Sequence, residues 1–210
     1  MSERLKSADV LAADLPDWRM ISDALYATYR TGSFTAGLAL VQRIADAAEA
    51  ADHHPDLTLT YPQVEVKLYC HDVGGVTDRD LALARSISEL AAAAGHEPVT
   101  DHTVVEFGLD TATTGTQATF WSVVLGAQVV AEDEVAGGTH APTVWFQPAG
   151  AGSSQRWHPD VWVPHDRAEE RIGGILAAGG TLVDDSHAPE WWVLADPDGN
   201  RFCICTNLQR

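Results

Sequence analysis

Three histidines, His53, His54 and His71, fall within nineteen residues of this 210-residue chain. The ordinary pKa of histidine lies closest to neutral pH, so a group of histidines can give and take protons there. Glu49 precedes His53 by four positions, and Asp80 follows His71 by nine. A glutamate and a histidine four apart on a helix share one face and can pair. These residue types indicate general acid and base catalysis without a metal ion.

The same residues admit structural interpretations. Histidines often bind zinc, although adjacent histidines at the end of a helix point in different directions and share an ion poorly. They can also serve as simple caps of a helix end. Asp80 lies three residues after Thr77, which is the spacing of a capping box. For Asp80 the sequence therefore supports a structural role and a chemical role equally.

Apolar periodicity indicates the elements that position these groups. Residues 34–52 are typical of an amphipathic helix ending at the histidine pair, with a predicted apolar stripe of Leu38, Val41, Ile44, Ala45 and Ala48. Residues 63–70 alternate between apolar and polar side chains and predict a strand that ends before His71. A second helix is predicted from Thr77 to Gly95. Short strands are predicted at 18–21, 24–30 and 57–61.

A polar stretch at residues 97–102 contains Pro98, and the pattern changes after it, so we place a domain boundary there. Beyond it, a strand, a helix and further strands are predicted twice, over 104–147 and 157–206. The predicted fold class is α+β. Residues 1–98 are expected to form an antiparallel sheet with helices on one face, and residues 102–210 a paired βαβββ domain.

The first half resembles the pterin-4a-carbinolamine dehydratases. That family carries an acidic residue, His-His-Pro, an aromatic residue, a further His and an Asp at set intervals. Every slot is filled here, by Glu49, His53, His54, Pro55, Tyr61, His71 and Asp80. The resemblance implies a hydro-lyase that dehydrates 4a-hydroxytetrahydropterin to quinonoid dihydropterin, in the recycling of a tetrahydrobiopterin-type cofactor. The pterin is then the substrate, and no cofactor is expected.

The resemblance also implies roles for these residues. His53, His54, His71 and Asp80 are expected to be catalytic, and Glu49, Pro55 and Tyr61 to bind the substrate. Among the histidines, we assign proton transfer to His53 and His71 and orientation of the substrate to His54. A non-catalytic module that binds a pterin or a protein is the alternative.

The second half is similar to the glyoxalase/vicinal-oxygen-chelate superfamily. The similarity rests on Phe120-Trp121 followed by Leu125-Gly126, and on Asp196-Pro197-Asp198-Gly199-Asn200 before the last predicted strand. Enzymes of that superfamily take metal ligands from both repeats, so a metal-dependent lyase or dioxygenase is a further alternative for this half.

The expected ligand set is incomplete in this half. His158 takes one ligand position, but Cys203 stands where a glutamate is usual. Val104 and Val105 lie near the place of the usual histidine, with Glu106 beside them, and Gln147 is a poor ligand for a hard ion. We therefore expect no metal, and instead a cup that is lined by some of Trp145, Trp157, Trp162, Trp191 and Trp192 and binds an organic ring.

The charge of the chain restricts its partners. Its 13 basic and 30 acidic residues give a formal net charge of -17, which argues against a nucleic-acid groove and against an anionic membrane surface. The three cysteines form no disulfide framework, which favours a reducing, cytoplasmic compartment. We expect a small-molecule pterin as partner and a homo-oligomer, with no nucleic acid and no membrane.

Overall fold

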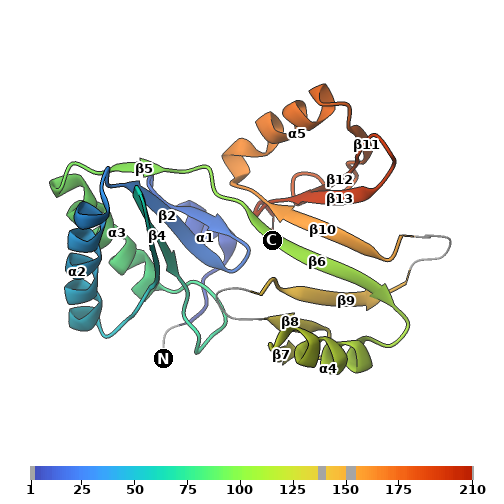
Figure 1. Ribbon diagram of the computed structural model, residues 1–210, viewed down its shortest axis with the longest axis horizontal. Coiled ribbons are helices and arrows are strands. Elements are labelled where there is room, and N and C mark those ends of the chain that lie inside the picture. Colours follow the sequence, from blue (N-terminus) through green and yellow to red (C-terminus); the bar gives the residue numbers. More distant parts are fainter. Residues whose placement is uncertain (1–2, 137–140, 150–154, 210) are drawn as a thin grey trace. The chain divides into compact units, whose positions relative to one another are not determined.

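The computed structural model describes residues 3–136, 141–149 and 155–209. The chain divides into two compact units, Met1–His102 with Asn207–Arg210, and Thr103–Thr206 (Figure 1). The elements of the first unit are α1 (Ser7–Leu11), β1 (Arg19–Ile21), β2 (Ala24–Arg30), α2 (Phe34–Ala51), β3 (Asp56–Thr60), β4 (Gln63–Leu68), α3 (Asp78–Ala93) and β5 (Glu97–Val99).

The first unit is built on an antiparallel sheet with the strand order β1-β2-β4-β3, and β5 also pairs with β2. The α+β fold predicted for this half is confirmed, and α1 is an element that the sequence did not predict. Residues 97–99, which the sequence predicts to lie in a polar boundary, form a strand whose Pro98 is paired with Tyr29.

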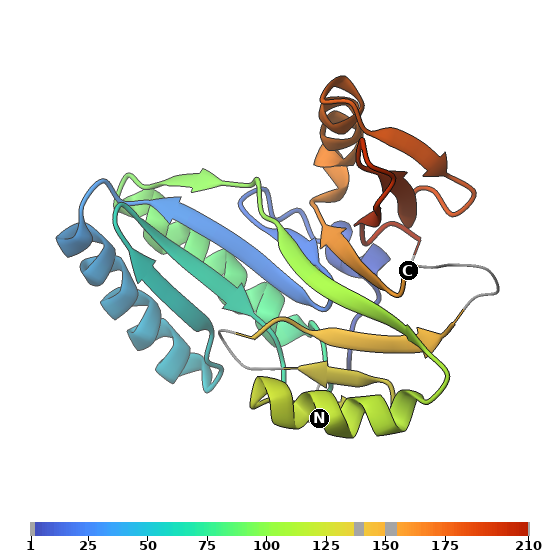
Figure 2. The ribbon, with the colours of Figure 1, turned by 45° about the vertical axis from the view of Figure 1, so that its right-hand side comes forward.

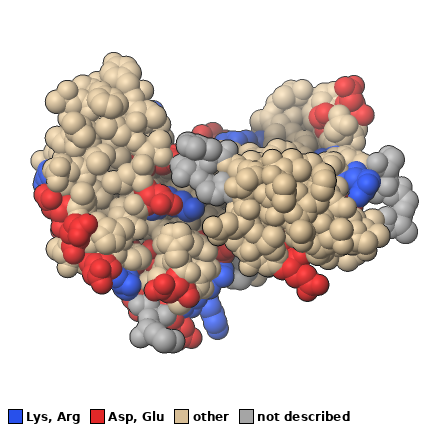
Figure 3. Space-filling view, turned by 60° about the horizontal axis from the view of Figure 1, so that its bottom comes forward, with Lys and Arg blue, Asp and Glu red and all other residues tan. Residues whose placement is uncertain are grey.

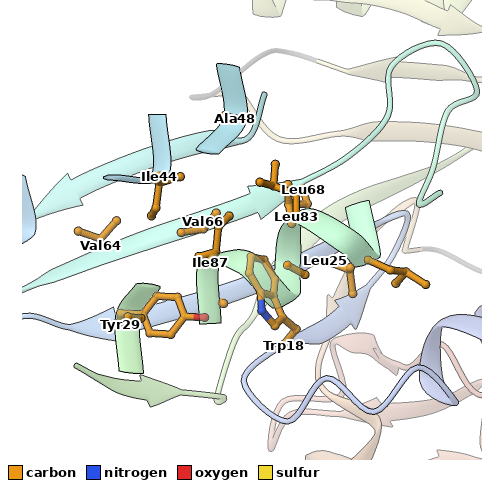
Figure 4. Packing of buried hydrophobic residues seen from close by; sticks show 14 of the residues in the cluster. Trp18, Leu25, Tyr29, Ile44, Ala48, Val64, Val66, Leu68, Leu83 and Ile87 are labelled. Carbon is orange, nitrogen blue, oxygen red and sulfur yellow. The ribbon is translucent and has the colours of Figure 1, made fainter. Parts of the chain in front are cut away.

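The core of the first unit lies between this sheet and the helices α2 and α3 (Figure 4). Leu25, Ala27 and Tyr29 of β2 pair with Leu68, Val66 and Val64 of β4, so these six side chains share one face of the sheet. The predicted alternation of residues 63–68 is confirmed, because Val64, Val66 and Leu68 are all fully buried.

The buried stripe of α2 includes Ile44 and Ala48 as predicted, but it differs from the prediction in the first half of the helix. Its buried residues are Gly37, Leu40, Ile44 and Ala48, whereas Leu38 is 55% exposed. Gly37 lies against β3 and β4, where a Cβ atom would come within 2.6 Å of Leu59 Cδ1. The close approach of helix and sheet at this glycine determines which face of α2 is buried, and it turns Leu38 to the surface.

The second unit contains the predicted repeat. Its elements are β6 (Val104–Thr111), α4 (Thr114–Leu125), β7 (Gln128–Ala131), β8 (Glu134–Ala136), β9 (Val144–Pro148), β10 (Trp157–Trp162), a 3₁₀ turn η1 (His165–Arg167), α5 (Ala168–Ala177), β11 (Thr181–Asp184), β12 (Trp191–Ala195) and β13 (Arg201–Cys205). The strands of the second unit form one sheet with the order β11-β12-β13-β10-β6-β9-β8-β7. The two repeats are joined where β6 pairs with β10.

The helices cover one face of this mixed sheet (Figure 2). Helix α4 packs on Leu109, Val135, Val144 and Phe146, and α5 packs on Val163, Leu194 and Ile204. Side chains alternate along a strand, so the neighbours of these residues point to the opposite face. That second face carries the polar side chains described below.

All three cysteines are free. Within the described parts of the chain, none of the helices combines the length and the apolar character needed to cross a bilayer.

Candidate active site

The histidine site of the first unit is centred on a buried pair. His53 Nε2 lies 2.7 Å from Asp80 Oδ1, and the two side chains are 7% and 0% exposed. His53 follows the end of α2, where its backbone N–H donates to the carbonyl of Ala48. Asp80 lies in the first turn of α3. The pair therefore joins the C-terminal end of one helix to the N-terminal end of the next.

Asp80 is held in place through its second carboxylate oxygen. The backbone N–H of Thr77 donates to Asp80 Oδ2 at 2.8 Å, and the Thr77 hydroxyl donates to the same oxygen at 2.9 Å. The capping box predicted from the sequence is present. Asp80 thus caps α3 with one oxygen and holds His53 with the other, so the structural and the chemical interpretation of this residue are compatible.

The partner of Glu49 differs from the predicted one. Glu49 Oε1 lies 3.2 Å from His54 Nε2 and is not paired with His53. The reason is local: α2 ends at Ala51, and Asp52 adopts the left-handed conformation with φ of 47°. The helical i, i+4 geometry therefore stops before His53, whose ring turns inward to Asp80 while His54 stays at the surface.

His71 follows β4 and is exposed, with its ring edge-on to Tyr69 at a centroid distance of 5.0 Å. The antiparallel register pairs Asp56 with Lys67, so the start of β3 lies beside the end of β4. His54 and Pro55 immediately precede β3, and His71 comes shortly after β4. The hairpin therefore brings the three histidines to one end of the sheet.

Tyr61 lies at the other end of the same hairpin. It follows β3 at the turn into β4, where Thr60 pairs with Gln63, and it is 73% exposed. Six residue steps along β3 separate Tyr61 from Pro55, which is roughly 20 Å at a rise of about 3.4 Å per residue. Within one chain, Tyr61 is not brought to the histidines, in contrast to the role expected for it.

The second unit has a separate polar cluster on the face that the helices leave uncovered. His158 Nδ1 lies 3.3 Å from Asp160 Oδ1, and His158 Nε2 lies 4.0 Å from Asp110 Oδ1. Gln147 Nε2 donates to Asp110 at 2.7 Å and lies 3.4 Å from His158 Nε2. Cys203 completes the cluster, because β10 and β13 pair Asp160 with Cys203.

The electrostatics of this cluster follow from its two aspartates. The hydrogen bond and charge of Asp160, with the charge of Asp110, raise the pKa of His158 above its ordinary value, although burial acts in the opposite direction. Burial, followed by the charge and hydrogen bond of Asp160, raises the pKa of the Cys203 thiol.

The register also shows which first-repeat residues lie beside this cluster. Asp110 pairs with Gln147 as Asp160 pairs with Cys203, and Gly108 precedes Asp110 by two residues as His158 precedes Asp160. Across the antiparallel β6–β10 pair, His158 lies directly opposite Gly108. Since glycine offers no side chain and Gln147 only a neutral amide, these positions do not fit a metal ion shared between the repeats.

The tryptophans of the second unit divide between the two faces of the sheet. Trp145 and Trp162 lie on the polar face, where Trp145 contacts the His158 ring edge-on at 5.3 Å and Trp162 donates to Glu106 at 3.0 Å. Trp191 shares that face through its pairing with Cys205. Trp157 and Trp192 pair with Leu109 and Ile204 and so point to the helix side.

A groove of about 630 Å³ runs along α4, lined by Gly115, Thr116, Thr119, Phe120, Val123 and Val124. Figure 3 shows the area over α4 free of Lys, Arg, Asp and Glu. The groove contains no group that titrates near neutral pH, and its lining includes neither the histidines of the first unit nor the His158 cluster. We do not assign the acid and base chemistry to it.

Two family models match separate parts of the chain. The family model described as pterin 4 alpha carbinolamine dehydratase matches residues 3–90, and the model described as glyoxalase-like domain matches residues 106–205. A crystal structure described as a transcriptional coactivator/pterin dehydratase from Brucella melitensis aligns with a TM-score of 0.41 and 28% identity, over 42% of this chain and 98% of that chain.

Similar curated proteins match the first unit. One from Thermosynechococcus vestitus is 46% identical over 93 residues, which are 43% of this chain and 98% of that protein. One from Nocardia farcinica is 45% identical over 94 residues, 43% of this chain and 99% of that protein. Both carry the name "Putative pterin-4-alpha-carbinolamine dehydratase".

The first unit is thus an α+β domain with a histidine site between two helices and a hairpin. Through this unit the chain belongs to the pterin-4a-carbinolamine dehydratase family, and its second unit is a glyoxalase-like domain.

Proposed function

We propose that the first unit catalyses the dehydration of a 4a-hydroxytetrahydropterin to the quinonoid dihydropterin. Membership of the dehydratase family supports the reaction class. The observation that carries the proposal is the buried His53–Asp80 pair, which fixes the end of α2 from which His54 projects. A site built only to cap a helix would not need a second histidine at the surface beside it.

The reaction needs one acid and one base. The C4a–O bond breaks with its electron pair leaving on oxygen, which takes a proton from the acid and departs as water. The ring nitrogen loses its proton to the base, and its electrons form the new double bond to C4a. The proton gained by the base replaces the one given by the acid, so the protein ends the cycle unchanged after proton exchange with water. No electron is transferred to or from the protein.

The structure favours His54 and His71 for the proton transfers. The His54 side chain is 57% exposed, and His71 is exposed at the same end of the hairpin. His53, to which we assigned proton transfer from the sequence, is 7% exposed and has its Nε2 atom 2.7 Å from Asp80. We therefore propose that His53 and Asp80 position the loop that carries His54, with Glu49 as the neighbour that holds the His54 ring.

The test is a stopped-flow assay of the purified full chain with synthetic 4a-carbinolamine. Because the carbinolamine also loses water spontaneously, the measured quantity is the acceleration above the buffer rate. We expect acceleration proportional to protein concentration, with saturation at high substrate. A chain that binds the pterin, seen as quenching of pterin fluorescence, but leaves the rate unchanged would be a binding module and would contradict the proposal.

A further inference from the structure

The second unit brings together three side chains of types that can bind metal ions, and the dehydration proposed for the first unit does not use them. We propose that His158, Asp160 and Cys203 form a binding site for one divalent cation of the zinc class. The site lies wholly within the second repeat of the glyoxalase-like domain. It is independent of the pterin site proposed for the first unit.

The geometry of the three residues supports this assignment. Their ligand atoms all lie within 4.8 Å of one another. His158 and Asp160 are two apart on β10 and so share a face, and the parallel register sets Asp160 directly beside Cys203 of β13. A tetrahedral ion with bonds of about 2.0–2.3 Å holds its ligands roughly 3.3–3.8 Å apart, so side-chain rotations that close the group by about 1 Å suffice.

The chemical types of the ligands select the ion. Imidazole, carboxylate and thiolate are the three side-chain ligands that zinc accepts, and a thiolate disfavours magnesium and calcium. Three protein ligands leave the fourth tetrahedral position open to water or a small molecule. The ligands are also largely withdrawn from solvent, with side-chain exposures of 17% for His158 and 12% for Asp160.

The surroundings of His158 are built to orient its ring. A Cβ atom on Gly108 would lie 2.3 Å from His158 Cε1, so the ring occupies the space that this glycine leaves open. The Nδ1 atom faces Asp160, while Nε2 faces Asp110 Oδ1 at 4.0 Å and Gln147 Nε2 at 3.4 Å. A metal-bound histidine commonly directs its second nitrogen to a carboxylate, and Asp110 is a carboxylate on the Nε2 side of this ring.

A metal ion held by His158, Asp160 and Cys203 would occupy the face on which the sequence predicts an empty cup. The carboxylate of Asp160 lies two residues after His158 on β10, and the parallel register places it beside Cys203. The result is a ligand set on two adjacent strands rather than one divided between the repeats.

The test uses cobalt(II) as a spectroscopic substitute for zinc. The full chain is stripped with a chelator, desalted and titrated with Co²⁺. We expect one equivalent to bind, with visible bands of the intensity typical of four-coordinate cobalt and a near-ultraviolet thiolate-to-cobalt band. Cys203→Ser should abolish the thiolate band, and His158→Ala and Asp160→Asn should each weaken binding more than 10-fold. Asp110→Asn should weaken it about 10-fold, the size expected for a supporting residue.

Matched cysteine controls exist in the chain. Cys205 lies two residues further along β13, and Cys70 lies in the first unit, so Cys205→Ser and Cys70→Ser should keep the thiolate band. His71→Ala controls for cobalt at the first histidine site. Absence of a saturable cobalt equivalent in the wild-type chain would overturn the proposal whether or not the variants fold. A thiolate band that survives Cys203→Ser, or cobalt binding lost in His71→Ala, would also overturn it.

Discussion

His53 Nε2 and Asp80 Oδ1, 2.7 Å apart, connect two helices through the least exposed polar pair of the histidine site. Asp80 also accepts two hydrogen bonds from Thr77. One carboxylate therefore serves both the stability of α3 and the placement of the histidine loop, and the two contributions can be separated by mutation.

Asp80→Ala should lower the free energy of unfolding by about 2–4 kcal/mol. Loss of the cap accounts for about 1 kcal/mol, and the His53 ring left buried without a partner for about 1–3 kcal/mol. Thr77→Ala removes a capping side chain but leaves the carboxylate, so it should cost only about 1 kcal/mol. Urea unfolding of the two variants beside the wild-type chain gives the difference. Equal costs would mean that the His53 hydrogen bond contributes nothing.

His54→Ala and His71→Ala should each reduce kcat about 10²-fold or more, because each removes a proton-transfer group. His96→Ala and Tyr61→Ala are the controls. His96 lies beyond the far end of α3, and Tyr61 at the far end of the β3–β4 hairpin, so both should retain turnover. If His53→Ala lost turnover in a folded protein while His54→Ala kept it, proton transfer would have to be reassigned to His53.

Gly108→Ala should destabilise the second unit, because the new methyl group would lie 2.3 Å from His158 Cε1 and 2.8 Å from Trp145 Cζ2. Rearrangement of a packed site around an added methyl costs about 1–3 kcal/mol. Gly174→Ala is the matched control, since nothing lies within 4 Å of a Cβ atom there and alanine favours a helix by about 0.5–1 kcal/mol. Calorimetry should show opposite shifts in Tm. A neutral Gly108→Ala would show that the His158 ring moves aside freely.

His102 predicts a pH dependence of stability. Burial lowers the pKa of its imidazole, and its Nε2 atom is buried without a hydrogen bond. The folded state therefore binds a proton less readily than the unfolded chain, so this residue destabilises the fold progressively as the pH falls below about 6.5. The Tm of the His102→Leu variant minus the Tm of the wild-type chain should therefore increase when the pH is lowered from 7.5 to 5.5. A Tm difference independent of pH would show that His102 is not buried as a neutral ring.

A chain ending at His102 should fold and dehydrate the carbinolamine, whereas one ending at His96 should be less stable. The shorter chain loses β5 and its pairing with Arg30, Tyr29 and Thr28. The longer one keeps this strand and loses the bond from Asn207 Nδ2 to the Ser22 carbonyl, worth about 1 kcal/mol. Circular dichroism and the dehydration assay compare them. An inactive 1–102 chain beside an active full chain would mean that the second unit is required for the site.

The sequence alone determined those features that depend on neighbouring residues. The alternation of Val64, Val66 and Leu68 defines β4, and the Thr77–Asp80 spacing defines the start of α3. The repeated order of strands and helix in the second half follows from the same local patterns. Local periodicity is sufficient here because each pattern is set by one helix or strand facing one core.

Only the tertiary structure decided which side chains meet. Asp52, in the left-handed conformation, ends α2, and the His53 ring after it lies against Asp80, 27 residues away. Glu49 is closer to His53 in the sequence than Asp80 is, but it does not pair with it. The parallel register of β10 and β13 sets Asp160 beside Cys203, 43 residues away. Such pairs depend on strand order, on register and on the packing of distant elements. The residues next to either member of a pair in the sequence do not determine these features.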